Sequence, residues 1–288
     1  MEKHPTRPVY YFILIAVIIL GGLYVWDTHF RKGAFEPVSQ NTFNTQNSDT
    51  GLVNHLSFQN KKILQNNIYT SIDIEYPEFL LLDAQENRTV YDFYIDFIAE
   101  HNTISRENMK ARFETDEKNN GKDFSLFIPE AEEKYQAYAT YTPVQINDTF
   151  ISVLYLYGAF QGGAHGFENM FTLNYDVKNK KVLTLLDILK DTKIDESTPV
   201  LEYISEESRK QLLKKFAPEV EYKKTIDELV YDIDQHEFII QSIYDGTEPT
   251  TENFSIYTFT PDALTIYFGQ YQVASYADGI QEVVIPLK

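Results

Sequence analysis

The sequence predicts an α+β fold with a mainly antiparallel sheet and packed helices, preceded by one transmembrane helix. The chain has 21 Tyr and 20 Phe among its 288 residues, and aromatic side chains favour the pleated, half-buried surface of a sheet. Several segments alternate apolar and polar side chains, as strands do, and others repeat apolar side chains at helical spacing. An uninterrupted apolar run near the N-terminus adds the membrane helix.

The expected strands are recognised by their alternation. Residues 72–76 alternate apolar and acidic side chains, and we expect this strand to stop at Pro77. Residues 149–157 (TFISVLYLY) are apolar on both faces, which predicts a central strand covered on both sides. Further strands are expected at residues 135–141, 171–175, 254–259, 264–268 and 282–287, with a turn at Thr260-Pro261-Asp262.

The expected helices are recognised by capping residues and apolar spacing. Thr89 precedes residues 90–100, which repeat apolar side chains at helical spacing, and a second helical piece is expected after Ser105. Ser197-Thr198-Pro199 is a start signal for a helix that Pro218 ends. A short helix is also expected at residues 225–231, and a turn at Asn119-Asn120-Gly121.

Residues 9–26 (VYYFILIAVIILGGLYVW) carry no charge over 18 positions. As a helix this segment spans about 27 Å, close to the thickness of one hydrocarbon core. Aromatic residues lie near both of its ends, and no small-residue cleavage pattern follows it. We therefore expect an uncleaved signal-anchor. Basic residues flank it on both sides, so charge alone leaves its orientation open.

Composition excludes several classes of function. The 43 acidic and 25 basic residues give a net charge of −18, which opposes binding to nucleic acid. The chain has no cysteine, so it has neither disulfides nor thiolate metal sites. Neither a Gly-x-Ser-x-Gly elbow nor a His-Glu-x-x-His pattern is found. We therefore expect no enzymatic activity, and we assign no catalytic residue, metal or cofactor.

A glycine-rich segment, residues 158–166 (GAFQGGAHG), is expected to form a hairpin-like connection between two strands. Phosphate-binding glycine loops lead into a helix, which does not follow here, so nucleotide binding is not expected. His165 has three interpretations: a hydrogen bond to the turn backbone, contact with a ligand, or catalysis. The candidate binding residues in this segment are Gly162, Gly163, His165 and Gly166.

Tyr271 and Tyr276 complete the candidate binding set, because aromatic rings near the C-terminus can stack on sugar rings. Cross-strand packing is the alternative interpretation for Tyr271, as it is for Tyr257 and Tyr267.

The segment 158–189 resembles the core of the RsiV-like domain, DUF3298. The resemblance rests on Gly162–Gly166, on Asn174-Tyr175-Asp176 and on residues 183–189 (LTLLDIL). Residues 264–287 resemble the closing segment of the same domain. Residues 68–157, with Tyr76-Pro77 after the first strand, resemble its usual N-terminal companion, DUF4163. DUF4163 followed by DUF3298 is the arrangement of RsiV-like and PdaC-like extracytoplasmic modules.

The resemblance implies an exported C-terminal part and a division of the chain. We expect a cytoplasmic stub (1–8), a transmembrane signal-anchor helix (9–26), a flexible linker (27–66), a DUF4163-like part (67–157) and a DUF3298 part (158–288). The anti-sigma and deacetylase parts that relatives carry are expected to be absent.

The implied function is a binding or sensing module of the bacterial cell envelope, single-pass in the inner or plasma membrane. The implied partners are lysozyme-like basic proteins or peptidoglycan. Two alternatives stay open: a cell-envelope hydrolase that uses His165 with acidic partners, and a structural envelope protein.

Overall fold

The computed structural model describes residue 53 and residues 57–190, 199–228 and 233–287. Its larger sheet has six strands in sequence order, and all neighbouring pairs are antiparallel except β2 and β3, which are parallel. The strands are β1 (Phe58–Asn66), β2 (Thr70–Phe79), β3 (Tyr135–Ile146), β4 (Phe150–Phe160), β5 (Phe167–Asp176) and β6 (Lys181–Val182).

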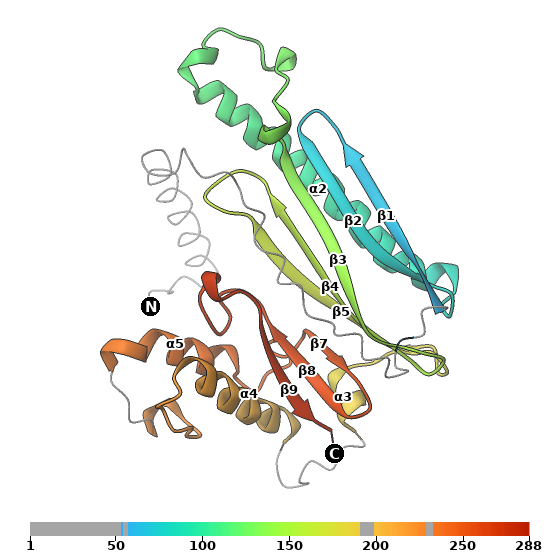
Figure 1. Ribbon diagram of the computed structural model, residues 1–288, viewed down its shortest axis with the longest axis vertical. Coiled ribbons are helices and arrows are strands. Elements are labelled where there is room, and N and C mark those ends of the chain that lie inside the picture. Colours follow the sequence, from blue (N-terminus) through green and yellow to red (C-terminus); the bar gives the residue numbers. More distant parts are fainter. Residues whose placement is uncertain (1–52, 54–56, 191–198, 229–232, 288) are drawn as a thin grey trace, which may run out of the picture.

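The long helix α2 (Ala84–Thr115) connects the two parallel strands and covers one face of this sheet (Figure 1). It begins in a capping box, in which the Asp83 side chain accepts from the Glu86 backbone and the Glu86 side chain accepts from the Asp83 backbone. Phe93 packs on Phe171 of β5 with ring centroids 4.6 Å apart, and Phe171 stacks on Tyr155 of β4 at 4.5 Å. The core between helix and sheet is therefore largely aromatic.

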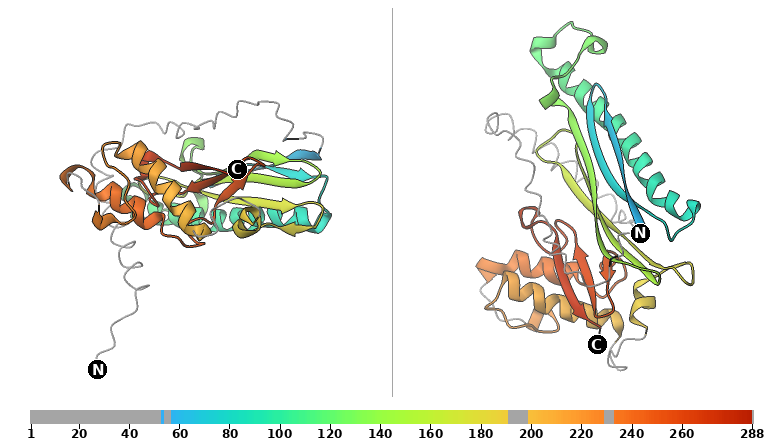
Figure 2. Two further views of the ribbon diagram at one scale, coloured as in Figure 1. Left: turned by 90° about the horizontal axis from the view of Figure 1, so that it is seen from below. Right: turned by 45° about the vertical axis from the view of Figure 1, so that its right-hand side comes forward.

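A smaller antiparallel sheet forms the other half of the molecule, with helices packed against it (Figures 1 and 2). Its strands are β7 (Tyr257–Phe259), β8 (Ala263–Phe268) and β9 (Gln281–Pro286), and its helices are α3 (Leu185–Leu189), α4 (Val200–Phe216) and α5 (Ile233–Gly246). Single 3₁₀ turns occur at Glu117–Asn119, Phe124–Leu126, Ala131–Glu133, Ile226–Glu228 and Tyr276–Asp278.

A buried polar joint connects the two sheets. Ser152 of β4 and Asn174 of β5 are 0% and 3% exposed, and the Ser152 hydroxyl donates to Asn174 Oδ1 at 2.7 Å. Asn174 Nδ2 donates to the Tyr257 carbonyl at 2.8 Å, and the Phe259 amide donates to Ser152 Oγ at 3.0 Å. Two side chains of the larger sheet thereby provide hydrogen-bond partners for backbone groups on the outer edge of β7. These groups would otherwise belong to an unpaired strand edge.

Most of the expected elements are confirmed, including the α+β class and the mainly antiparallel pairing. Residues 151–155 of β4 are buried consecutively, as expected for a central strand covered on both faces. The turn at Asn119-Asn120-Gly121 is also confirmed, with Gly121 at φ 76°. Helix α4 ends at Phe216, shortly before Pro218.

Four expectations about the folded part were wrong. Pro77 does not stop β2, because it lies opposite Asn60 where β2 has already separated from β3. The two helical pieces around Ser105 are one helix. Residues 58–66 of the expected linker form β1, and the expected division at 157/158 cuts through β4. Helix α5 had no counterpart in the expected elements.

The expected stub and signal-anchor helix (1–26) lie outside the described residues, as does most of the expected linker. Within the described part of the chain, no helix combines the length and the apolar character that crossing a membrane requires.

Candidate functional site

The glycine-rich segment forms the turn between β4 and β5, and its glycines are required by the backbone. Gly162 and Gly163 have φ of 89° and 106°, a region that other residues rarely occupy. A Cβ atom at Gly162 would lie 2.8 Å from the Tyr135 hydroxyl, and one at Gly166 would lie 2.8 Å from the Ala159 carbonyl. The glycines therefore have a structural role in this turn.

The loop between β8 and β9, residues 269–280, comes from the smaller sheet and meets this turn. The Tyr276 hydroxyl donates to the Gly166 carbonyl at 3.1 Å, across 110 positions of sequence. Gln272 anchors the loop, because its Nε2 donates to the carbonyls of Gly246 and Asn253 at 3.2 and 2.9 Å. Figure 1 places the β4–β5 turn and this loop on the same side of the molecule.

Three aromatic rings form a row along this contact. The ring centroids of His165 and Tyr276 are 4.3 Å apart, and those of Tyr276 and Tyr271 are 5.7 Å apart. His165 and Tyr271 are exposed, whereas Tyr276 between them is half-buried. We call His165, Tyr276 and Tyr271 the aromatic row. The structure thus brings all six candidate binding residues to one surface.

Tyr271 is held in an unusual conformation. Its φ is 66°, in a region that costs a non-glycine residue conformational energy, and its side chain is 64% exposed. It lies in a loop rather than in a strand, so its alternative interpretation as a cross-strand packing residue was wrong. Tyr257 and Tyr267, by contrast, are buried strand residues, as that interpretation predicts for them.

A carboxylate lies beside the aromatic row. Glu168 at the start of β5 accepts a hydrogen bond from the Tyr138 hydroxyl on β3. Burial raises the pKa of Tyr138 above its ordinary value, and the hydrogen bond to Glu168 raises it further. Burial and the charge of Glu168 also raise the pKa of Tyr276. Neither Tyr138 nor Glu168 was among the candidates, because each belongs to an ordinary alternating strand.

His165 has the geometry of a turn residue. Its Nδ1 lies 2.7 Å from the Gly166 carbonyl, which can only accept, so Nδ1 is the donor of this hydrogen bond. Among the described residues, no carboxylate is hydrogen-bonded or ion-paired to this histidine. No group of three or more His, Asp or Glu side chains in the described part of the chain is arranged to hold a metal ion. This geometry gives a His165-based hydrolase no support.

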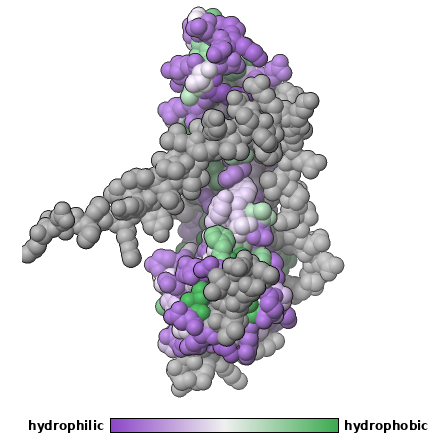
Figure 3. Space-filling view, turned by 90° about the vertical axis from the view of Figure 1, so that its left-hand side faces the viewer, coloured by the Kyte–Doolittle hydropathy of each residue, from purple (hydrophilic) through white to green (hydrophobic). Residues whose placement is uncertain are grey.

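Figure 3 views the molecule from the left-hand side of Figure 1. It shows pale and green side chains gathered below a hydrophilic upper end. A separate shallow depression of about 360 Å³ lies at the start of α2, and it contains none of the six candidates; its lining residues are Tyr76, Glu78, Ala84, Asn87, Arg88 and Tyr91.

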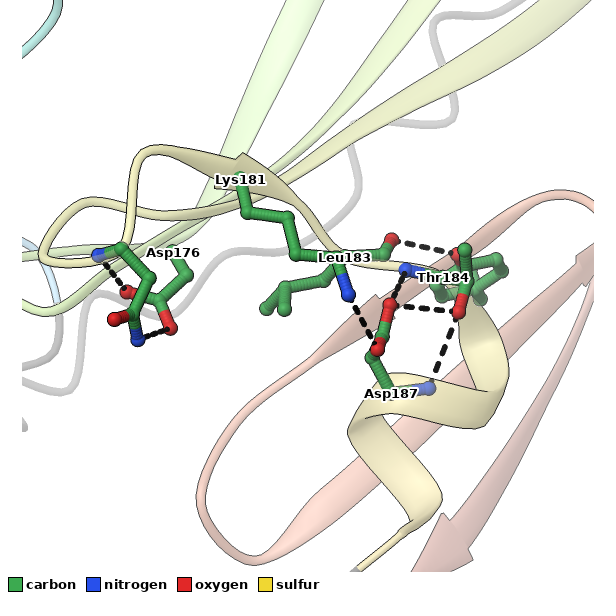
Figure 4. A network of polar contacts seen from close by, with 7 residues as sticks. Asp176, Lys181, Leu183, Thr184 and Asp187 are labelled. Carbon is green, nitrogen blue, oxygen red and sulfur yellow. Dashed lines mark hydrogen bonds and ion pairs between the residues drawn. The ribbon is translucent and has the colours of Figure 1, made fainter.

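The other two motifs behind the family resemblance, Asn174-Tyr175-Asp176 and residues 183–189, are structural (Figure 4). Asp176 accepts from the backbone and side chain of Asn179 and closes the β5–β6 turn. Thr184 and Asp187 form the capping box of α3, and Lys181 Nζ lies 2.6 Å from Asp187 Oδ1. The hydrogen bond from Lys181, with those from Thr184, lowers the pKa of Asp187. With Asn174 in the buried joint, these motifs connect the two sheets.

A protein-family model matches the C-terminal third of the chain. Residues 187–288 match the family model described as "Protein of unknown function (DUF3298)". No curated protein matches the chain. A solved DUF3298 family member from Bacteroides fragilis is 18% identical, with 80% of this chain and 90% of that chain covered and a TM-score of 0.48. A second, from Pseudomonas aeruginosa, has the same identity and coverage and a TM-score of 0.43.

The matched residues begin within α3 and include α4, α5 and the whole smaller sheet. The glycine turn and Asn174-Tyr175-Asp176 lie before them, in the larger sheet. The candidate surface therefore combines Tyr271 and Tyr276 from the matched region with a turn from outside it. Residues 187–288 are therefore similar to the DUF3298 family.

Proposed function

We propose that the chain is an extracytoplasmic binding module of the bacterial cell envelope, in which the aromatic row is the contact surface. The observation that carries this proposal is the meeting of six residues, chosen from two distant segments, on one exposed aromatic surface. The remaining parts of the proposal come from the RsiV-like resemblance: a DUF4163-like N-terminal part, a membrane anchor at residues 9–26, and lysozyme-like proteins or peptidoglycan as partners.

The chemistry of the surface supports a binding role. Tyrosine is enriched at protein interfaces because it offers a large, rigid ring at low cost in side-chain entropy. Tyr271 has its positive φ in a turn that the Gln272 amide closes onto the Gly269 carbonyl, and this turn presents an aromatic ring that is 64% exposed. Glu168 adds a negative group beside the rings, and the whole chain has a charge of −18. A basic protein partner fits this electrostatic field.

Calorimetry on the full chain tests the proposal, with a lysozyme and soluble peptidoglycan fragments as separate titrants. We expect one of the two to bind, and Tyr271→Ala to weaken that binding about tenfold or more, because exposed aromatic anchors carry much of an interface's energy. Tyr91→Ala is the matched control, since Tyr91 is 40% exposed on α2 and lies away from the aromatic row. Absence of heat with both titrants contradicts the proposal.

The proposed anchor and orientation need a separate test. Protease added to intact spheroplasts, which reaches only the outer side of the membrane, should digest the folded part. Protease that reaches only the cytoplasmic side of the membrane should leave it intact. The reverse pattern, or release of the chain by a salt wash without detergent, would show that residues 9–26 do not anchor an exported module.

A further inference from the structure

The glycine turn does not hold itself in place. Gly162 and Gly163 both have positive φ, and glycine backbones lose more conformational freedom on ordering than any other residue. Within the turn, the hydrogen bond between the His165 ring and the Gly166 carbonyl spans only neighbouring residues. The position of His165 therefore depends on contacts that reach the turn from other elements.

One such set of contacts comes from α2. Asn108 Nδ2 donates to the Gln161 carbonyl at 2.6 Å, directly before the two glycines. Gln161 Nε2 lies 3.3 Å from His101 Nδ1, and His101 Nε2 lies 3.4 Å from Ser105 Oγ. His101, Ser105 and Asn108 follow each other at four- and three-residue spacing, which places them along one stripe of the helix.

His101 is suited to this arrangement in its neutral form. Its ring is 0% exposed, and burial lowers its pKa to about 4, against an opposing hydrogen bond to the Tyr135 backbone. The amide nitrogen of Gln161 is a donor, so Nδ1 acts as the acceptor and the proton sits on Nε2, toward Ser105. The neutral ring thus accepts from the turn, and its N–H faces Ser105 and the Tyr135 backbone.

We propose that Asn108, His101 and Gln161 form a bracket through which α2 positions the aromatic row. The bracket holds the turn on one side, and Tyr276 holds Gly166 on the other. His165 is fixed between them against the Tyr276 ring. Asn108, His101 and Gln161 are positioning residues. They act on the binding surface by preorganising the turn, which reduces the entropy lost on binding. The consequence for binding rests on the proposed function, whereas the bracket itself does not.

Hydrogen exchange of the full chain, followed by mass spectrometry on peptides covering residues 159–168, tests the bracket. Asn108→Ala removes the donor to the Gln161 carbonyl, and Asn108→Asp removes it while keeping the side-chain shape. Both should raise exchange in these peptides about two- to tenfold, the factor that loss of one neutral hydrogen bond corresponds to. Glu107→Ala, an exposed neighbour on the same helix, should leave the exchange unchanged.

A second variant tests the histidine contact. Gln161→Met keeps the side-chain length and the backbone carbonyl that Asn108 binds, but it removes the amide that faces His101. It should raise exchange in the same peptides, while peptides from β8 and β9 keep their wild-type rates and so confirm the fold. The bracket is overturned if Asn108→Asp and Gln161→Met both exchange like the wild-type chain.

Binding supplies a readout that separates the two proposals. If the wild-type chain binds the lysozyme, Asn108→Ala should weaken that binding by a factor similar to its effect on exchange, although Asn108 lies outside the aromatic row. Wild-type binding with an unchanged affinity of Asn108→Ala contradicts the positioning role. Absence of binding by the wild-type chain to both the lysozyme and the peptidoglycan fragments contradicts the proposed function alone, and the exchange result still decides the bracket.

Discussion

At the scale of single residues, the candidate site depends on backbone conformations that few side chains allow. Gly162 combines a positive φ with close approach to Tyr135, and Tyr271 has a positive φ without being glycine. The glycine turn and His165 could be found from the sequence because glycine clusters mark special backbone geometry. Glu168 and His101 could not, because their roles arise only when β5 and α2 are packed against other elements.

The first prediction concerns Gly162. Gly162→Ala should destabilise the protein by about 2 to 3 kcal/mol, because a β-carbon meets the Tyr135 hydroxyl in a backbone region that is already strained for alanine. Gly121→Ala is the control, since Gly121 has a similar φ of 76° but an open surrounding. Urea unfolding measures both. An effect at Gly162 no larger than that at Gly121 would mean that the contact with Tyr135 does not constrain the turn.

The second prediction concerns His101 and pH. The unfolded chain binds a proton at this residue below about pH 6.5, whereas burial lowers the pKa in the folded chain to about 4. The unfolded state therefore binds more protons between these values, and this contribution to stability is complete above pH 6.5 and is lost on acidification toward pH 4. Its size is on the order of 2 to 3 kcal/mol.

Urea unfolding at several pH values between 4 and 7 measures this contribution. The difference in stability between the wild-type chain and His101→Asn should shrink as the pH falls through this window. A stability difference for His101→Asn that is independent of pH would show that the buried ring is not kept neutral by the fold.

At the scale of elements, the sequence predicts regular, two-faced strands and helices well and misses those whose signals are unusual. Strand β1 is an edge strand with a polar sequence (QNKKILQN), so it resembles the linker before it. Helix α2 continues past Ser105, a buried serine that faces His101 one turn earlier on the same helix, although serine has only a weak helix preference. Proline was a misleading stop signal at Pro77, since β2 has no partner on that side.

The third prediction concerns the joint between the sheets. Asn174→Ala leaves the Tyr257 carbonyl without its donor and the Ser152 hydroxyl without its acceptor, in a buried place. We expect a loss of about 2 to 4 kcal/mol in unfolding free energy and faster hydrogen exchange in β7. Asn179→Ala, at an exposed turn, should cost less than about 1 kcal/mol. Equal effects of the two substitutions would contradict a structural joint at Asn174.

At the scale of the whole molecule, the candidate surface joins two halves that the sequence treats separately. The turn belongs to the larger sheet, and Tyr271 and Tyr276 lie in the region that matches the DUF3298 family model. The sequence could supply both sets of candidates, but their meeting depends on the joint of Ser152 and Asn174, which sets the two sheets against each other. The sequence also does not show that β4 and β5 belong to one sheet, and the expected division at 157/158 therefore falls inside the larger sheet.

The fourth prediction concerns charge. With a net charge of −18, the chain should bind a basic lysozyme less tightly as salt rises, because added ions screen the attraction between charges more than about 10 Å apart at 0.1 M salt. Titrations at low and high sodium chloride measure this, with an uncharged chitooligosaccharide as the comparison. A lysozyme affinity that does not change with salt would contradict an electrostatic contribution.

The central claim is that the aromatic row is where a partner binds, and a hydrogen-exchange footprint of the bound state tests it most directly. With saturating lysozyme or peptidoglycan fragments, residues 161–166 and 269–280 should become protected, because these two segments carry the aromatic row. The depression at Tyr76 and Tyr91 should keep its free-state exchange. Protection at that depression, or anywhere else, with the turn and loop unchanged would contradict the account.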